Sequence, residues 1–193
     1  MDFKQFAFTK GMSTSDACLV LKETVNMYMK NRGSACVCFM DLSKAFDRVD
    51  HIKLGNIWLK KGLPPDIVLL LMNYLCNQYG RIIWQGKKGE YQRIPTGVRQ
   101  GGILSPMLFK LYMDNILKEF GQVEKGCQLG PYRLNILAYA DDVAILANNE
   151  NNLVEFCNAF EERIEDLKLT VNQDVWFFVV IKEKDQSLLI NMR

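Results

Sequence analysis

Three aspartates in two separate segments are the residues of this sequence best suited to chemistry. Asp141 and Asp142 are adjacent in LAYADDVAIL (137–146), between two apolar runs, and Asp41 follows an apolar stretch at 35–40. Carboxylates beside a buried core repel one another and lose hydration, so they favour a cation or a solvated turn nearby. Adjacent central strands would bring all three carboxylates to one edge of a sheet, where we expect them to bind divalent metal.

Mg²⁺ is the metal that such a set of ligands would suit best. It takes a few carboxylates and completes its coordination with water and substrate phosphates. Two ions about 4 Å apart activate an attacking hydroxyl and stabilise the leaving oxygen of a phosphoryl transfer. The pattern therefore favours two-metal nucleotidyl transfer with Mg²⁺ or Mn²⁺. Taken alone, an aspartate pair is explained equally simply by the chemistry of a hairpin turn.

The hydrophobic pattern predicts the elements that must position these aspartates. Apolar runs predict a strand at 35–42, buried on both faces, and two strands within 132–147 that meet at the aspartate pair. Apolar spacing and caps predict helices at 14–31, around 51–61, from Leu63, from Ser105 and at 152–168, and a hairpin with a basic tip at 80–94. This order favours an α+β fold with helices packed on one side of an antiparallel sheet.

Composition narrows the class of protein further. The 193 residues are 49% hydrophobic, which is enough for a sizeable core. The net charge of +2 hides an uneven distribution, because 60–110 carries eight Lys/Arg against two Asp/Glu, and 111–174 carries five against twelve. The first of these segments suits a polyphosphate partner. Six cysteines without a CxxC pair, and no apolar stretch of membrane length, predict an intracellular, non-secreted protein with no membrane partner.

Three motifs, in order, resemble the palm of reverse transcriptases, most of all those of non-LTR (LINE-type) retrotransposons. They are FMDLSKAFDRVDH (39–51), GVRQGGILSPMLFKLYMDNIL (97–117) and AYADDVAIL (138–146). QFAFTKGMSTSDA (5–17) and LKLTVNQDV (167–175) resemble the segments that flank this palm. The resemblance covers roughly 3–182 and implies an RNA-directed DNA polymerase that extends a DNA primer on an RNA template with deoxynucleoside triphosphates.

The resemblance also implies an architecture. It is that of a reverse-transcriptase-like palm, an antiparallel sheet packed on helices with a ferredoxin-like core. Residues 1–193 would form a single domain fragment with partial fingers and no thumb. The fingers-like parts would be 1–34 and 64–98, and the palm would be 35–63 and 99–182.

Roles for individual residues follow from the same resemblance. Asp41 and Asp141 would hold two catalytic Mg²⁺ or Mn²⁺ ions, with Asp142 as electrostatic support or a less direct ligand. The implied nucleotide-binding residues are Lys44, Ala45, Phe46, Gln100 and Gly101. Within this set, backbone N–H groups near Lys44 and Ala45 would cradle the triphosphate, and Phe46 would lie under the sugar and exclude a 2′-hydroxyl.

Basic residues between the first two motifs would follow the template backbone. The implied template-binding residues are Arg81, Lys87, Lys88 and Arg99. Each role has a simpler alternative when its residue is taken alone. Phe46 is then a core aromatic, and Lys87 and Lys88 are solvated charges in a turn.

Four positions depart from the family pattern. Thr9 and Met12 stand where arginines are usual, and Val175 and Trp176 stand where a lysine and a small hydroxyl residue are expected. The chain also begins after the upstream fingers region. We therefore expect weak or undetectable polymerase activity from the isolated chain, since lost alignment of substrates lowers rate steeply. The alternative is a catalytically inactive nucleic-acid-binding or interaction remnant of a retrotransposon.

Overall fold

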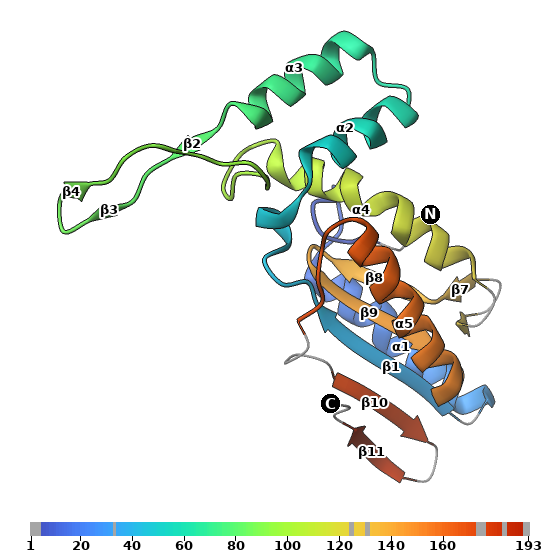
Figure 1. Cartoon of the computed structure of the whole chain (residues 1–193). Helices are drawn as coiled ribbons and strands as arrows, with labels where there is room; N and C mark the ends of the chain where they lie inside the picture. Colours follow the sequence, from blue (N-terminus) through green and yellow to red (C-terminus); the bar gives the residue numbers. More distant parts are fainter. Residues whose placement is uncertain are drawn as a thin grey trace. The chain divides into compact units, whose positions relative to one another are not determined.

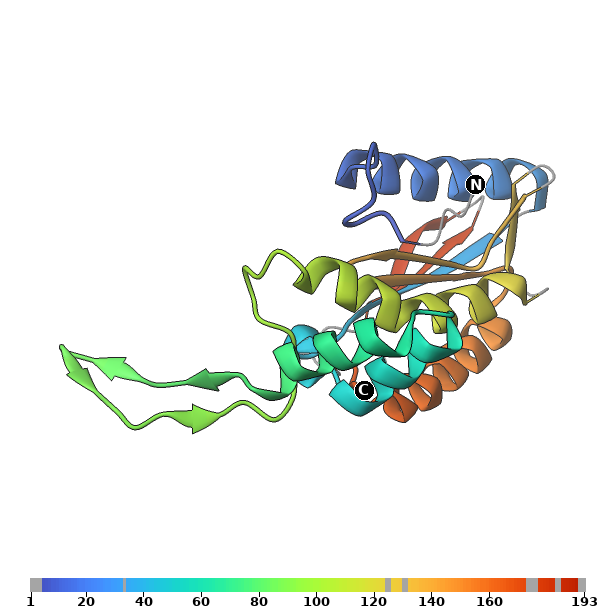
Figure 2. The same ribbon diagram turned by 90° about the horizontal axis from the view of Figure 1, so that it is seen from above.

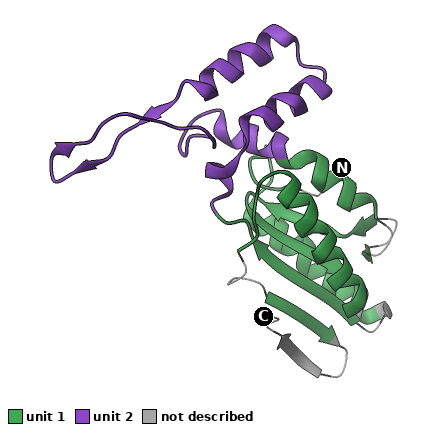
Figure 3. Ribbon diagram, viewed as in Figure 1, with its two compact units in different colours: residues 1–43, 113–193 green, residues 44–112 purple. Residues whose placement is uncertain are grey.

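The computed structural model of the chain describes residues 5–32, 34–123, 126–129, 132–172, 177–182 and 185–190. The chain divides into two units, which Figure 3 shows in different colours. The sheet unit consists of Met1–Ser43 and Met113–Arg193, and the insert unit is Lys44–Tyr112. The assignment of fingers and palm segments from the sequence has other boundaries and stays a prediction.

A five-stranded antiparallel sheet forms the centre of the sheet unit, with the strand order β11-β10-β1-β9-β8 (Figure 1). Its strands are β1 (Ser34–Asp41), β8 (Ile136–Tyr139), β9 (Asp142–Ala147), β10 (Phe177–Lys182) and β11 (Asp185–Ile190). A separate two-stranded sheet pairs β6 (Cys127–Leu129) with β7 (Tyr132–Leu134). The apolar run of β1 is paired on both sides, as the sequence predicts for a central strand.

Helices cover both faces of this sheet. Figures 1 and 2 show α1 (Thr14–Arg32) on one face and α5 (Glu150–Asp166) on the other. The expectation of helices on one side only is therefore wrong. The reason lies in β1, where Val37 and Ala35 pack under α1 while the alternate residue Cys38 is also fully buried. A strand that is apolar on both faces needs cover on both faces.

Local signals explain where the helices of the sheet unit begin. At the start of α1 the Ser13 backbone N–H donates to Asp16 Oδ2 (2.8 Å), and the Asp16 N–H donates to Ser13 Oγ (3.2 Å). This reciprocal pair is a capping box. Asn149 caps α5 by accepting from the Asn152 N–H at 2.8 Å. α5 then packs its Phe160 edge-on against Phe120 of α4 (Ser105–Gln122), with ring centroids 5.4 Å apart.

The insert unit is built from short helices and a long hairpin. Its elements are the 3-10 helix η1 (Ala45–Arg48), α2 (His51–Lys60), α3 (Pro65–Cys76), and the strands β2 (Tyr79–Gly80), β3 (Ile83–Trp84), β4 (Lys87–Lys88) and β5 (Gln92–Arg93). β2 pairs with β5 and β3 with β4. No helix within the described ranges is long and apolar enough to cross a membrane.

The turn of this hairpin differs from the predicted basic tip. Trp84 pairs with Lys87, so the turn residues are Gln85 (φ 47°) and Gly86 (φ 75°). Two positive φ angles in succession are those of a type I′ turn, whose twist matches that of the strands. Lys87 and Lys88 consequently lie in β4 beside the turn and are exposed.

Candidate active site

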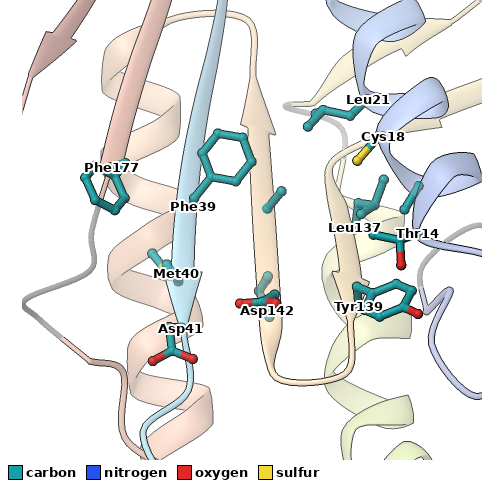
Figure 4. A pocket seen from close by; sticks show the side chains of 13 residues that line it. Thr14, Cys18, Leu21, Phe39, Met40, Asp41, Leu137, Tyr139, Asp142 and Phe177 are labelled. Carbon is teal, nitrogen blue, oxygen red and sulfur yellow. The ribbon is translucent and has the colours of Figure 1, made fainter.

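Asp41 and Asp142 meet at one end of the central strand pair. Asp41 is the last residue of β1, Asp142 is the first residue of β9, and they are direct cross-strand partners. Cβ atoms of directly opposed residues lie about 4.5–5.5 Å apart. Side chains two residues apart share a face, so both aspartates stand on the face that carries Phe39 and Ala144, towards α1. Figure 4 shows the two carboxylates at the same level of the sheet.

Asp141 belongs to the same edge through its backbone. It follows Ala140 in the two-residue turn that joins β8 to β9. The Leu42 N–H donates to the Asp141 carbonyl oxygen at 3.2 Å, which ties this turn to the end of β1. The sequence prediction that the three aspartates meet at one sheet edge thus agrees with the backbone geometry.

The three carboxylates also interact electrostatically. Partial desolvation raises the pKa of Asp142 above its ordinary value, and the negative charges of Asp141 and then Asp41 raise it further. Clustered carboxylates of this kind favour a cation, because each additional negative charge makes the others harder to ionise.

The donor set fits a hard divalent cation, although it does not form a finished cage. Within the described part of the chain, no three Asp, Glu, His or Cys side chains converge closely enough to hold an ion by themselves. Mg²⁺ does not require that, since it is commonly bound by one or two carboxylates together with waters and substrate phosphates. Carboxylate oxygens from Asp41, Asp141 and Asp142 are the appropriate chemistry for it.

An apolar pocket of about 260 Å³ lies beside these carboxylates (Figure 4). Asp41 and Asp142 form its polar end. The remaining walls come from α1, β1, β8, β9 and the first residue of β10, and they include Cys18, Phe39, Leu137 and Phe177.

The residues predicted to bind nucleotide lie in the insert unit, where two of their segments are hydrogen-bonded together. The Val98 N–H donates to the Phe46 carbonyl oxygen at 2.8 Å. Gln100 Nε2 donates to Asp47 Oδ1 at 3.4 Å. The loop that carries Gln100 and Gly101 is thereby held against η1.

Phe46 and Lys44 have conformations that bear on their predicted roles. The Phe46 ring is partly exposed and stacks on Phe109 of α4, with centroids 4.6 Å apart and planes inclined by 19°. Lys44 is exposed and left-handed (φ 50°), and Ala45 after it begins the 3-10 helix.

The residues predicted to bind template are divided between the hairpin and the loop. Arg81, Lys87 and Lys88 are exposed on the hairpin, where the Arg81 guanidinium lies 4.8 Å from the centre of the Tyr91 ring. Arg99 instead lines a groove of about 810 Å³ together with Gln100 and Tyr79.

Comparison with known proteins decides the family. The family model described as "Reverse transcriptase (RNA-dependent DNA polymerase)" matches residues 1–184. The chain belongs to the reverse transcriptase family. This confirms the family prediction that the sequence motifs support.

Relatives of this reverse transcriptase domain are polyproteins and polymerases of mobile elements. It is 26% identical over 166 residues to a "Retrovirus-related Pol polyprotein from type-1 retrotransposable element R2" of Nasonia vitripennis, covering 86% of this chain and 16% of the relative. It is 28% identical over 153 residues to an "RNA-directed DNA polymerase from mobile element jockey" of Drosophila melanogaster, covering 76% of this chain and 16% of the relative. The chain thus spans about a sixth of these relatives.

Solved structures confirm the reverse-transcriptase-like α+β fold. Apo telomerase from Candida tropicalis, truncated from its C-terminal domain, superposes with a TM-score of 0.67 at 15% identity, covering 91% of this chain and 36% of the telomerase chain. Telomerase from Candida albicans in complex with a fragment of telomeric RNA gives 0.66 at 13% identity, covering 90% and 31%. At these identities the likeness concerns the fold alone.

Sequence reasoning missed one residue that contacts Asp41 in this reverse transcriptase domain. Asn172 Nδ2 donates to Asp41 Oδ2 at 3.3 Å, and the Asn172 N–H donates to the Asp41 carbonyl oxygen at 2.8 Å. Asn172 stands inside the LKLTVNQDV segment, so the motif contained the signal without its meaning. Val175 and Trp176, which depart from the family pattern, lie outside the described residues.

Proposed function

We propose that this chain is the catalytic core of an RNA-directed DNA polymerase. It would extend a DNA primer on an RNA template with deoxynucleoside triphosphates and two divalent ions, Mg²⁺ or Mn²⁺, in an intracellular setting. The carrying observation is the cross-strand pair Asp41 and Asp142 beside the turn of Asp141, in a chain of the reverse transcriptase family. The fingers-like and palm segments expected from the sequence are part of this proposal.

The aspartates of the sheet edge act as metal ligands in this proposal. Asp41 and Asp141 hold the ions, and Asp142 adds negative charge beside them. When bound, such ions activate the primer hydroxyl and stabilise the leaving oxygen of the in-line displacement. Asn172 supports the site by fixing one oxygen of Asp41, as partners of metal ligands commonly do.

The insert unit supplies the nucleotide contacts in this proposal. The left-handed Lys44 followed by η1 supports a role in triphosphate binding, because successive N–H groups in such a bend form an anion-binding concavity. Phe46, stacked on Phe109, has the rigidity needed to discriminate at the sugar. Gln100 and Gly101 line the nucleotide and template-base side.

The hairpin and the adjoining groove supply the template contacts. Arg81, Lys87 and Lys88 are exposed cations, and Trp84, with 73% of its surface exposed, offers a face on which a base can stack. Arg99 adds a positive charge in the groove.

Single-nucleotide extension of oligo(dT) on poly(rA) tests the proposal, with the chain in excess over primer and with Mn²⁺ or Mg²⁺. We expect slow incorporation that requires the metal, that Asp141→Asn abolishes and that Asp166→Asn leaves unchanged. Asp166 is a matched control, since it is an exposed aspartate paired with Arg163 on α5. Equal incorporation by Asp141→Asn would contradict the proposal. Binding of the primer–template without any incorporation would favour the inactive remnant instead.

A further inference from the structure

The N-terminal segment pairs with the edge strand of the sheet next to the aspartate turn. Among the described strands β8 ends the sheet, and Gln5 forms a parallel bridge with Ala138 on it. The Phe6 N–H donates to the Ala138 carbonyl oxygen at 2.9 Å. Phe6 and Ala7 are both buried, with exposed fractions of 1% and 2%, so the segment is anchored in the core of the sheet unit.

The side chain of Gln5 contacts both backbone polar groups of Ala140. Gln5 Oε1 accepts from the Ala140 N–H at 3.0 Å and from the Ala7 N–H at 3.1 Å. Gln5 Nε2 lies 3.4 Å from the Ala140 carbonyl oxygen and donates to it. Only 8% of the Gln5 surface is exposed, so these bonds are made where water competes little.

Ala140 needs such support because its backbone is strained. It has a φ of 57°, in the left-handed region that glycine or asparagine usually occupies. Ala140 is also the first residue of the two-residue turn whose second residue is Asp141. Relaxation of Ala140 would therefore rotate the peptide that carries Asp141 and shift the start of β9 at Asp142.

We propose that Gln5 is a positioning residue for the catalytic turn. Its amide holds Ala140 in the left-handed conformation and thereby fixes Asp141 and Asp142 for metal binding. The inference deepens the proposed function and depends on it for the meaning of the metal site. The hydrogen bonds from Gln5 to the turn do not depend on polymerase activity.

The test compares Gln5→Met and Gln5→Glu with Thr9→Val in the full chain. Methionine keeps the length of Gln5 without its hydrogen bonds, whereas glutamate keeps the oxygen acceptors. Thr9→Val is the matched control, because Thr9 Oγ1 bonds within the same segment to the Gln5 carbonyl oxygen at 2.9 Å and not to the turn. The readouts are hydrogen exchange of the Ala140 amide and Mn²⁺ affinity measured with the metal alone.

Gln5→Met is expected to accelerate exchange of the Ala140 amide and to weaken Mn²⁺ binding about tenfold, as loss of a supporting contact does elsewhere. Gln5→Glu should keep the Ala140 amide protected, and Thr9→Val should match the wild type in both readouts. If Gln5→Met fails to fold, Gln5→Glu decides the matter, and rapid exchange of its Ala140 amide would overturn the proposal.

A second comparison separates positioning from a merely structural role. Ala140→Gly removes the strain, because glycine adopts positive φ freely. Gln5→Met should therefore weaken Mn²⁺ binding less in the Ala140→Gly background than in the wild type. An equal loss in both backgrounds would overturn the inference. If these effects appear but neither wild type nor variants extend a primer, the polymerase proposal fails and the positioning role stands.

Discussion

Asp41 and Asp142 oppose each other directly across β1 and β9, the last residue of one strand against the first residue of the next. Like charges in opposed positions destabilise an antiparallel pair. The raised pKa of Asp142, caused by partial desolvation and by Asp141 and Asp41, is the electrostatic sign of that conflict. A divalent cation would relieve it, so the edge is better suited to binding metal than to stabilising the sheet.

Removal of the amide that contacts Asp41 should weaken this metal site. We expect Asn172→Ala to lower Mn²⁺ affinity about tenfold, because Asp41 Oδ2 loses its 3.3 Å hydrogen bond and gains rotational freedom. Isothermal titration with Mn²⁺ measures the effect. Asn151→Ala, an exposed asparagine on α5, is the control and should bind as the wild type does. Unchanged affinity in Asn172→Ala would show that Asp41 needs no such support.

A smaller side chain at Phe46 should relax the choice of sugar. Phe46→Val leaves space under the sugar, so the ratio of kcat/KM for a ribonucleotide to that for the matching deoxynucleotide should rise about tenfold or more. The ratio is the useful measurement, because loss of the Phe109 stack lowers the amount of folded protein equally for both substrates. A constant ratio would mean that Phe46 is a core aromatic and no more.

Loss of a hairpin lysine should reduce the salt dependence of RNA binding. Each phosphate contact of a single strand contributes about 0.7 to the slope of log affinity against log salt. Lys87→Ala should lower the slope by about that amount, measured by fluorescence anisotropy with labelled poly(rA). Lys118→Ala removes the same charge from a lysine paired with Asp114 at 2.9 Å and should leave the slope unchanged. Identical slopes for wild type and Lys87→Ala would remove Lys87 from the template site.

The loop before Gln100 should tolerate no side chain at Gly97. Gly97 has a φ of 90°, and a Cβ there would lie 2.7 Å from the Asp47 carbonyl oxygen. Gly62 has a similar φ of 82° with nothing within 4 Å, so Gly62→Ala tests backbone strain alone, at about 1–2 kcal/mol. Gly97→Ala should cost about 1–3 kcal/mol more in the free energy of unfolding, from overpacking. Equal losses in urea denaturation would show that the loop yields at Asp47.

Local patterns were sufficient to predict most elements of this fold. The apolar run before Asp41 predicts β1, helical spacing with Ser13 and Asp16 as caps predicts α1, and the aspartate pair marks the β8–β9 turn. These signals depend on neighbours within a few residues, which is the range over which periodicity and capping act.

Relations between distant residues could not be predicted in the same way. Gln5 reaches Ala140 across 135 positions and Asn172 reaches Asp41 across 131, and no local pattern encodes either contact. The face of the sheet that α1 covers is likewise set by packing. The hairpin turn moved to Gln85 and Gly86 because cross-strand register, rather than the lysine pair, determines its place.

The measurement that tests the central claim most directly is Mn²⁺ binding to the chain, followed by electron paramagnetic resonance. The account predicts that wild type binds Mn²⁺ and that Asp41→Asn and Asp142→Asn each weaken binding by about tenfold or more, since each removes a charge from the opposed pair. Asp166→Asn, which removes a charge from the surface of α5, should bind as the wild type does. Equal Mn²⁺ affinity in wild type, Asp41→Asn and Asp142→Asn would contradict the claim that this sheet edge is a metal site.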